Sequence, residues 1–363
     1  MKFGHFCLPT YIPDSDGPVG AFLRRWLDLL VRSEELGFDS IWANEHHFDP
    51  YGGVVPSTPI LLSAVAQRTQ RVRLGTSVVV LPLHNPVQIA EQLAMVDVLS
   101  GGRLEFGLGR GFVVADYEAL GIPRDNAQER LLEGLEVILK AWSSRGPFTH
   151  RGTHYHYEDV DVWPRPEQQP HPPVWLSCTQ SPDSFAYAGR RGFRLLTIAY
   201  VAHTQLAELI GRYQEAWQEA GYPAAGWEIS THYHTVVAED GAEARRLAET
   251  ALRRYLAITA HARQRARAAE PPRNFTDEEL QIDRLLSANR TLAGRPDDVV
   301  AQLEQARDRW GLTGVDCTFY FGGLSYEQAQ RSQHLFATEV MPRVRGRTLV
   351  KGGVPTDGRH SHA

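Results

Sequence analysis

The chain turns from strand to loop within the stretch Asp39-Ser40-Ile41-Trp42-Ala43-Asn44-Glu45-His46-His47-Phe48. Asp39 to Ala43 predicts an apolar strand, and a loop rich in Gly and Pro follows it. The loops at the carboxyl ends of strands are where α/β barrels gather their reactive side chains. Adjacent side chains on an extended backbone point to opposite sides. We therefore expect at most one of His46 and His47 to face a central cavity; a purely structural Glu-His pair is the alternative.

Seven further apolar runs repeat the strand pattern. They are Lys2–Leu8, Val72–Val80, Leu104–Leu108, Val174–Cys178, Arg194–Ile198, Glu228–Val237 and Val315–Phe321. Amphipathic helical patterns intervene, and a glycine follows each of those at Ala21–Leu36, Val87–Leu99 and Thr204–Ala220. Eight strands alternating with helices predict an α/β fold with a parallel sheet, and eight is the number that closes a (β/α)8 TIM barrel. An open doubly wound sheet is the alternative, but no Gly-x-Gly-x-x-Gly follows the first strand.

Two insertions interrupt this alternation, after strands 4 and 7. Residues 145–173 are rich in Pro, His and Tyr and predict a hairpin plus an extended connection. Residues 260–284 are too polar for a core, and an excursion after the seventh strand lies at the active-site face, so we expect a lid there. A disordered surface loop is the alternative. Residues 346–363 are expected to form a flexible tail, which leaves residues 1–345 as a single barrel domain.

The composition excludes several classes of protein. The 363 residues are 42% hydrophobic and carry a formal net charge of −5, without a basic block before the C-terminal end, so nucleic-acid binding is not expected. The chain opens with a strand and contains no run of 18 apolar residues, which argues against a secretion signal and a membrane span. Cys7, Cys178 and Cys317 lie in separate strand-like runs, which indicates buried reduced thiols in a cytoplasmic protein. Residues 150–156 hold three histidines without a nearby cysteine or paired acid, so no metal site is predicted.

Two turns have the chemistry of an anion site. Gly107-Leu108-Gly109-Arg110-Gly111 ends the fourth strand, and its guanidinium offers a fork to a phosphate. Ser181 and Pro182 begin a helix after the fifth strand, where free amides attract anions. Asp183 would repel a phosphate unless it points outward, and plain helix capping is the alternative. Because strands four and five are neighbours in a barrel, the two turns could hold one phosphate together.

Together these motifs closely resemble the bacterial luciferase-like flavin monooxygenase family. The similar segments are Glu45–Phe48, Leu74–Pro82, Asn85–Val87, Leu99–Arg103, Phe106–Gly111, Ser181–Ser184, Phe321–Leu324, Phe336 and Met341–Pro342. The order and spacing of so many motifs make the resemblance specific at family level. It implies a (β/α)8 barrel, reduced FMN as cofactor, O2 as co-substrate and a separate flavin reductase. We also expect a homodimer.

The resemblance assigns roles at the flavin ring. His46 matches the family's active-site histidine, and Glu45 and His47 flank it as cofactor-binding positions. Ser77 and Val78 match the pair whose backbone supports the isoalloxazine, commonly through a non-proline cis peptide. These roles are implied by the family resemblance and do not follow from the spacing of the residues alone.

The resemblance also assigns the phosphate end. Arg110 matches a phosphate-binding arginine, and Arg130 is similar to a second one across a short gap. The remaining matched phosphate positions are Gln180, Ser181 and Ser184. Gly109, also a cofactor-contact position, departs from the pattern, because the light-emitting enzymes have a reactive cysteine there. We therefore expect no bioluminescence and extra room over the flavin face.

The function implied is that of an FMN-dependent monooxygenase. Reduced FMN and O2 would form a C4a-(hydro)peroxyflavin that transfers one oxygen atom to an organic small molecule, with His46 as the catalytic residue. Two alternatives stay open: a deazaflavin-dependent hydride-transfer oxidoreductase, and a flavin-binding protein without catalysis. The substrate is not specified by the sequence.

Overall fold

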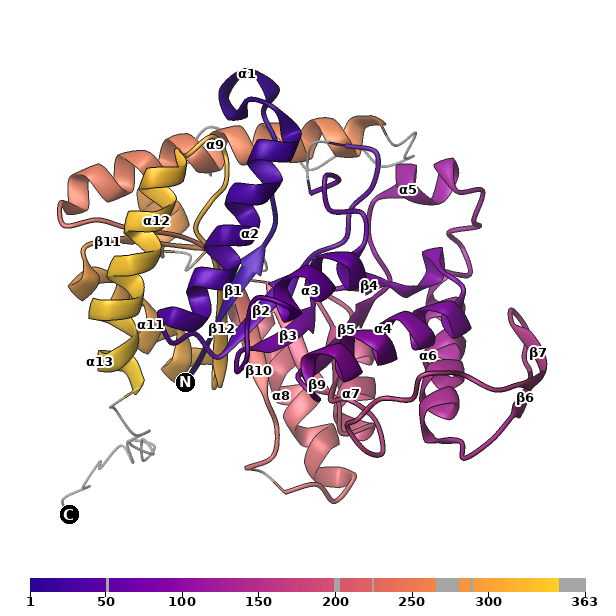
Figure 1. The fold of residues 1–363 in the computed structure, drawn as a ribbon. Coiled ribbons are helices and arrows are strands. Elements are labelled where there is room, and N and C mark those ends of the chain that lie inside the picture. The colour runs from indigo at the N-terminus through magenta and orange to yellow at the C-terminus, as the bar shows by residue number, and fades with distance from the viewer. Residues whose placement is uncertain (50–51, 199–202, 224, 266–280, 288–289, 346–363) are drawn as a thin grey trace, which may run out of the picture.

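Eight parallel strands form a closed barrel in the computed structural model, which describes residues 1–49, 52–198, 203–223, 225–265, 281–287 and 290–345 (Figure 1). The strands are β1 (Lys2–Cys7), β2 (Ser40–Ala43), β3 (Arg73–Thr76), β5 (Leu104–Gly109), β8 (Val174–Ser177), β9 (Arg194–Ile198), β10 (Ile229–Val237) and β12 (Gly314–Thr318). Strand β10 pairs with β12 on one side and β9 on the other, which closes the ring. The predicted (β/α)8 TIM barrel is confirmed, and its strands lie in the eight apolar runs of the sequence.

Helices cover the outside of the barrel (Figure 1). The longer ones are α2 (Val19–Glu35), α3 (Thr58–Ala66), α4 (Pro86–Ser100), α6 (Ala127–Ser143), α7 (Pro182–Arg190), α8 (His203–Glu219), α11 (Pro296–Trp310) and α12 (Tyr326–Leu335). In α2 the side chains of Phe22, Trp26 and Leu29 are buried, and their spacing of four and three places them on one face. The predicted terminating glycines are present; Gly101 ends α4 in the left-handed region, with φ of +67°.

Short elements complete the described part of the chain. They are α1 (Pro13–Asp16), the 3-10 turn η1 (Leu81–Leu83), α5 (Val114–Ala119), α10 (Ile282–Ser287), the π-helical turn η2 (Phe336–Val340) and α13 (Met341–Arg345). Cys7, Cys178 and Cys317 are buried free thiols, as predicted, and burial raises the pKa of each thiol. Within the described residues, no helix has both the length and the apolar character needed to cross a membrane.

Two strand predictions need correction. The run Val72–Val80 is not one strand: it divides into β3 and β4 (Val79–Val80), and the peptide between Ser77 and Val78 is cis. An additional strand, β11 (Thr291–Gly294), pairs with the last four residues of β10 outside the ring of eight. The sequence analysis missed it because four residues between two helices are too few for a clear alternating pattern.

The insertion at residues 145–173 contains an antiparallel hairpin, β6 (Phe148–Arg151) and β7 (His156–Val160). The carboxylate of Glu133 on α6 holds its tip, because it accepts hydrogen bonds from the backbone amides of Thr153, His154 and Tyr155 at 2.8–3.1 Å.

The polar stretch at residues 260–284 is helical at both of its ends. Helix α9 (Gly241–Arg265) continues to residue 265, and α10 begins at Ile282. Ala, Arg and Gln at the end of α9 are strong helix formers, which accounts for the continuation. The middle of the predicted lid, residues 266–280, lies outside the described residues, as does the predicted tail, residues 346–363.

Helix α9 lies across the end of the barrel where the strands terminate (Figure 1). Its buried positions Ala244, Ala248 and Ala251 are small, so its backbone comes close to the loop after β12. A Cβ on Gly322 would lie 1.9 Å from the carbonyl oxygen of Ala251, and the φ of Gly322 is +57°. Only glycine fits there, for steric and conformational reasons.

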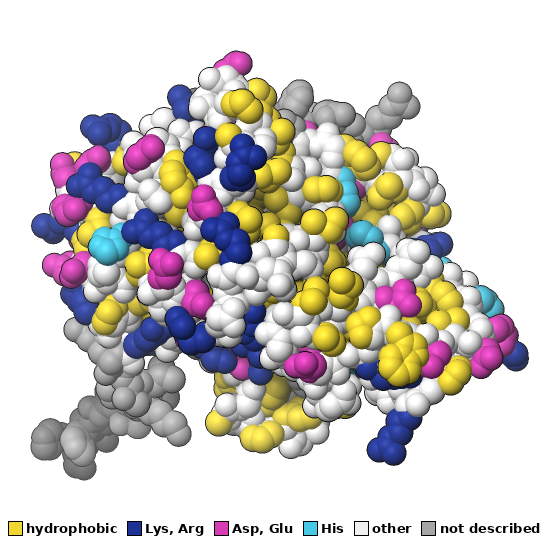
Figure 2. All heavy atoms as spheres, in the orientation of Figure 1, with side chains coloured by type: hydrophobic (Ala, Val, Ile, Leu, Met, Phe, Trp, Pro, Cys, Tyr) yellow, Lys and Arg dark blue, Asp and Glu magenta, His cyan; other side chains and the backbone are white. Residues whose placement is uncertain are grey.

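Helices α3 and α4 pack against each other and leave apolar side chains at the surface. Ile60 on α3 is 73% exposed, and Met95 and Leu99 on α4 are 53% and 44% exposed. Figure 2 shows hydrophobic side chains across the centre of this face, where Figure 1 places α3 and α4. The sequence of α3 contains no charged residue. Helices that are apolar on every side are usually covered on every side.

Candidate active site

The two histidines after β2 take different partners. Both are half-buried, and the His46 ring packs edge-on against Phe112, with 5.8 Å between ring centroids. His47 instead turns toward Glu45, with Nε2 2.9 Å from Oε1. The loop closes over His46 at Gly52, whose φ is +71° and whose Cβ would lie 2.7 Å from His46 Cδ2. The two rings therefore differ in their surroundings: His46 faces the loop after β5, and His47 is held by a carboxylate.

Glu45 is the centre of a hydrogen-bond network. Its side chain is 4% exposed, and Oε1 is within hydrogen-bond distance of His47 Nε2 (2.9 Å) and His84 Nε2 (2.7 Å). The other oxygen, Oε2, accepts from the backbone amide of Val80 at 3.2 Å. Both carboxylate oxygens are thus engaged by protein groups. This favours a positioning role for Glu45 over the direct cofactor contact expected from the sequence.

The network shifts the pKa values of its members. Burial opposes ionisation of Glu45, but the hydrogen bonds from His47 and His84 outweigh it and lower the pKa of Glu45 below its ordinary value. The hydrogen bond to Glu45 raises the pKa of His47. Nearby on α5, burial raises the pKa of Asp116 to about 6. Ionised Glu45 and protonated His47 therefore stabilise each other.

Glu45, His47 and His84 are also the three side chains that come close enough to hold a metal ion. Their ligand atoms lie within 4.8 Å of one another in the described part of the chain. However, the two short His–carboxylate distances already satisfy Glu45 Oε1. We interpret the cluster as a hydrogen-bond network. The prediction of no metal ion remains untested.

The segment between β3 and β4 lies directly beside the end of β5. Ser77 donates its backbone amide to the carbonyl of Ala43 at 2.7 Å, which ties the cis peptide to the end of β2. A Cβ on Gly109 would lie 3.0 Å from Cγ2 of Val78 and 3.3 Å from Cβ of Ser177. The expectation of extra room beside Gly109 is therefore wrong, because the side chains of Val78 and Ser177 already fill that space.

The predicted phosphate residues follow two neighbouring strands, β5 and β8. Arg110 is exposed, and its guanidinium has no ion-pair partner among the described residues, whereas its carbonyl accepts a hydrogen bond from Tyr117. Ser181 caps α7, since its hydroxyl accepts from the Ser184 amide at 3.4 Å. Gln180 and Ser181 are exposed, and Ser184 is half-buried. A free cation and a helix start thus border the same barrel edge, which suits a phosphate.

Arg130 is placed by other contacts. Its Nε donates to Asn126 Oδ1 at 2.9 Å, and its guanidinium lies 5.9 Å from the ring centre of Tyr155. The hairpin therefore contributes to holding this arginine.

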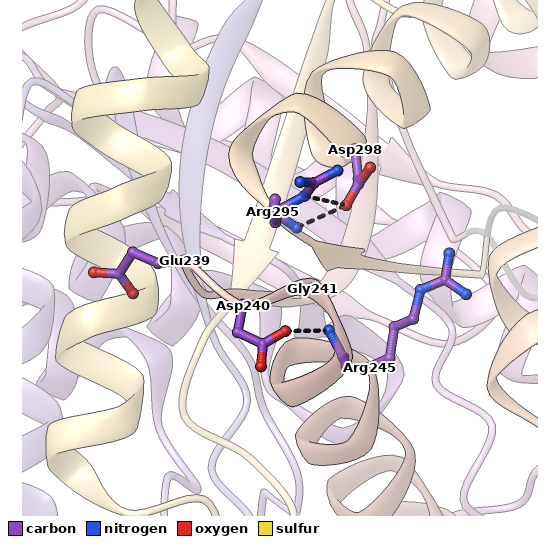
Figure 3. A pocket seen from close by; sticks show the side chains of 7 residues that line it. Glu239, Asp240, Gly241, Arg245, Arg295 and Asp298 are labelled. Atoms are coloured by element: carbon purple, nitrogen blue, oxygen red, sulfur yellow. Dashed lines mark hydrogen bonds and ion pairs between the residues drawn. The ribbon is translucent and has the colours of Figure 1, made fainter.

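Two hollows lie away from these residues. One, of about 540 Å³, is lined by Glu239, Asp240, Gly241, Ala242, Arg245, Arg295 and Asp298. Figure 3 shows that its charges largely pair with local groups: Asp298 interacts with Arg295, and Asp240 accepts from the amide of Ala242. The other, of about 190 Å³, lies at the opposite end of the barrel near Ser40 and Asp316. Burial raises the pKa of Asp316 to about 7, but that end of a TIM barrel ordinarily serves stability.

Sequence reasoning missed three residues of this region. His84 follows η1 and reaches Glu45 across 39 positions, so no local pattern could connect them. Phe112 and Asp116 follow β5; only their place after the Gly/Arg turn could have indicated them.

Comparison with known proteins identifies the family. The family model described as luciferase-like monooxygenase matches residues 1–314. The chain belongs to the luciferase-like monooxygenase family. It is an enzyme of the flavin-dependent oxidoreductase class, as its named relatives are.

Three relatives of this luciferase-like monooxygenase cover nearly all of it. The monooxygenase RslO1 of Streptomyces bottropensis is 30% identical, with a TM-score of 0.87 over 94% of this chain and 99% of that one. Limonene 1,2-monooxygenase of Rhodococcus erythropolis is 30% identical over 95% of this chain and 87% of its own. The oxygenase component of the flavin-dependent trigonelline monooxygenase of Acinetobacter baylyi is 28% identical over 87% and 88%.

More distant solved structures share the fold alone. The oxygenating constituent of 3,6-diketocamphane monooxygenase from Pseudomonas putida, in complex with FMN, is 20% identical with a TM-score of 0.76. An F420-dependent secondary alcohol dehydrogenase is 19% identical with a TM-score of 0.69. The fold therefore accommodates both kinds of cofactor.

Proposed function

We propose that this luciferase-like monooxygenase uses reduced FMN and O2 to insert one oxygen atom into an organic small molecule. The observation that carries the proposal is the convergence of three elements at the carboxyl end of the barrel. These are the half-buried His46, the Ser77–Val78 segment and the unpaired guanidinium of Arg110. The names of RslO1, limonene 1,2-monooxygenase and the trigonelline enzyme support oxygen insertion.

The residues present fit FMN. The donor set beside the ends of β5 and β8 combines the Arg110 guanidinium with the start of α7, which matches a phosphate dianion. Ser181 and Ser184 would hold that phosphate, and the backbone of Ser77 and Val78 would support the ring. When bound, reduced FMN supplies the reaction of O2 with the substrate, which is cofactor chemistry.

The protein's own contribution is placement and proton control. His46 packs on Phe112 and lies under the loop at Gly52, so its ring is oriented beside the proposed flavin face. There it would hold or deliver a proton at an imidazole nitrogen. His47 and Glu45 would fix the loop that carries it.

A separate flavin reductase would supply the reduced FMN. The name of the trigonelline enzyme's oxygenase component supports a two-component system. We also propose a homodimer, with the apolar surface of α3 and α4 as the contact. We further propose that the enzyme does not emit appreciable light, because Gly109 stands where the light-emitting enzymes have a reactive cysteine.

Oxygen consumption with product analysis tests the function. Purified protein would receive chemically reduced FMN or, separately, reduced F420, together with air and candidate terpenes and aromatic compounds. We expect O2 uptake with FMN and a product heavier by one oxygen atom, labelled from ¹⁸O2. Hydride transfer with F420 and no O2 uptake would instead support the deazaflavin alternative, and flavin binding without either reaction would support a binding protein.

A further inference from the structure

His232 on β10 lies against an apolar cluster that is separate from the larger hydrophobic core. The cluster includes Phe6, Leu196 and Phe321, and Val78 packs against it from the proposed flavin support. The rings of His232 and Phe6 have 4.3 Å between centroids. His232 is 8% exposed and Phe6 is 7% exposed, so neither residue is completely covered by protein. A ligand ring seated on Val78 would meet these side chains.

The hydrogen bonds of Thr318 fix the tautomer of His232. The Thr318 hydroxyl donates to the carbonyl of Phe6 at 2.8 Å, and the same oxygen lies 3.0 Å from His232 Nε2. A hydroxyl has one hydrogen, so the second contact requires Nε2 to be the donor. Burial lowers the pKa of His232 to about 3, so the ring is neutral and holds a single N–H. Nδ1 is therefore a bare acceptor.

This acceptor has no protein donor within the described residues. Its neighbour His234 contacts it ring to ring, with 5.0 Å between centroids, and the carboxylate of Asp316 accepts instead from Ser230 at 2.6 Å. His232 keeps 8% of its exposure, so a ligand that enters the barrel mouth can reach its ring. A ligand donor would satisfy this acceptor, and the aromatic walls suit a planar ligand.

We propose that Nδ1 of His232 accepts a hydrogen bond from an N–H or O–H group on a planar ligand in the barrel mouth. The proposal rests on the proposed function, because it takes the ligand to be either the flavin, through its ring imide N3–H, or the organic substrate, through a hydroxyl. His232 then determines specificity: it favours a ligand that has this donor over one in which the donor is methylated. Neither the family match nor the flavin phosphate site requires this role.

Two matched ligand pairs distinguish the sources by equilibrium binding without turnover. Oxidised FMN is compared with 3-methyl-FMN, and 2-naphthol is compared with 2-methoxynaphthalene on the FMN-loaded protein. We expect about tenfold tighter binding of the donor-bearing member in one of the pairs. Discrimination in the first pair assigns the flavin, and discrimination in the second assigns the substrate. Equal binding within both pairs overturns the proposal.

Two variants test the atom itself. His232→Phe keeps a ring but removes the acceptor, and we expect it to abolish the discrimination. Thr318→Val removes the group that holds the proton on Nε2, so the proton can move to Nδ1 and the discrimination should fall several-fold. Persistence of the full preference in either variant overturns the proposal. These experiments measure binding and no reaction. An absence of oxygenation activity together with an intact binding preference would therefore count against the proposed function and not against the role of His232.

Discussion

Nε2 of His84 lies 2.7 Å from Oε1 of Glu45, although 39 residues separate the two side chains. His84 follows η1, and Glu45 immediately precedes His46, so the contact joins the loop after β2 to the segment after β4. The amide of Val80 binds the second oxygen of Glu45 and strengthens this connection. The loop that carries His46 and the segment that follows Ser77 and Val78 are thus held together by one carboxylate.

Replacing Glu45 by Gln should therefore destabilise the fold in a pH-dependent way. The lowered pKa of Glu45 means that its contribution is present above its ordinary value of 4.5 and is lost as pH falls through the folded-state pKa. The raised pKa of His47 means that its contribution is present below 6.5 and is lost as pH rises through the folded-state pKa. We expect a loss of about 1.5–3 kcal/mol in urea unfolding, largest between pH 4.5 and 6.5.

The matched control is Glu129→Gln, since Glu129 also meets a histidine, His154, at 3.0 Å, but its side chain is 71% exposed. It should cost little at any pH, because exposed ion pairs contribute little. A flat difference between wild type and Glu45→Gln across pH 4.5–8 would contradict the charge assignment.

Arg110→Ala should weaken FMN binding at least tenfold, about 1.4 kcal/mol, because a free guanidinium beside a phosphate is lost. Fluorescence quenching of FMN under titration measures the affinity. Arg331→Ala is the control, since Arg331 pairs with Glu239 on an exposed surface. Equal affinities of wild type and Arg110→Ala would remove Arg110 from the phosphate site.

His46→Ala should still bind FMN but release hydrogen peroxide in place of oxygenated product. The reason is that His46 faces the loop after β5, whereas His47 is occupied by Glu45. Peroxide and product are measured together, so that coupling is obtained directly. His47→Ala should retain more of the coupling than His46→Ala; the opposite ranking would reverse the two roles.

Gly109→Ala should destabilise the protein by about 1–3 kcal/mol, because the new Cβ would press on Val78 and Ser177. Adding Val78→Ala should recover most of the loss, since the nearest contact is then removed. Urea unfolding of the two single variants and the double variant forms a cycle that measures the coupling. Strictly additive losses would show that Val78 does not limit the space at Gly109.

Ile60→Glu or Met95→Glu should convert the proposed homodimer to a monomer, because either places a charge in the apolar surface of α3 and α4. Light scattering coupled to gel filtration gives the mass. Leu120→Glu is the control, as Leu120 is 43% exposed beside α5, outside these helices. A monomeric wild type would refute the dimer, and a dimeric variant would move the contact elsewhere.

The sequence predicted features whose signal is local. The barrel strands lie in apolar runs, and Gly101 ends α4 by its own conformational freedom, so these predictions were correct except that the run Val72–Val80 divides into two strands. The two turns proposed to hold a phosphate could be predicted for the same reason, as glycine, arginine and a capping serine carry their chemistry in adjacent positions.

Features that depend on packing between distant segments were not predicted. His84 meets Glu45 only once the barrel is closed, and the tautomer of His232 depends on Thr318, which is 86 positions away. The error at Gly109 has a related origin: a glycine in the sequence does not tell whether the space beside it is empty or filled by another strand's side chain, here Val78.

The contact of Gly322 with Ala251 has a consequence for engineering this enzyme. Where two backbones touch, the distance between them cannot be tuned by choosing larger or smaller side chains, so α9 sits at a fixed height above the barrel mouth. Libraries that vary Ala244 or Ala248 would mostly lose folded protein. Libraries should instead vary Tyr255 and Leu256 further along the helix, where the side chains contribute to the apolar cluster that includes Phe6 and Phe321. The position of α9 is therefore set by its backbone contact, and only the side chains that it turns toward the barrel can be varied.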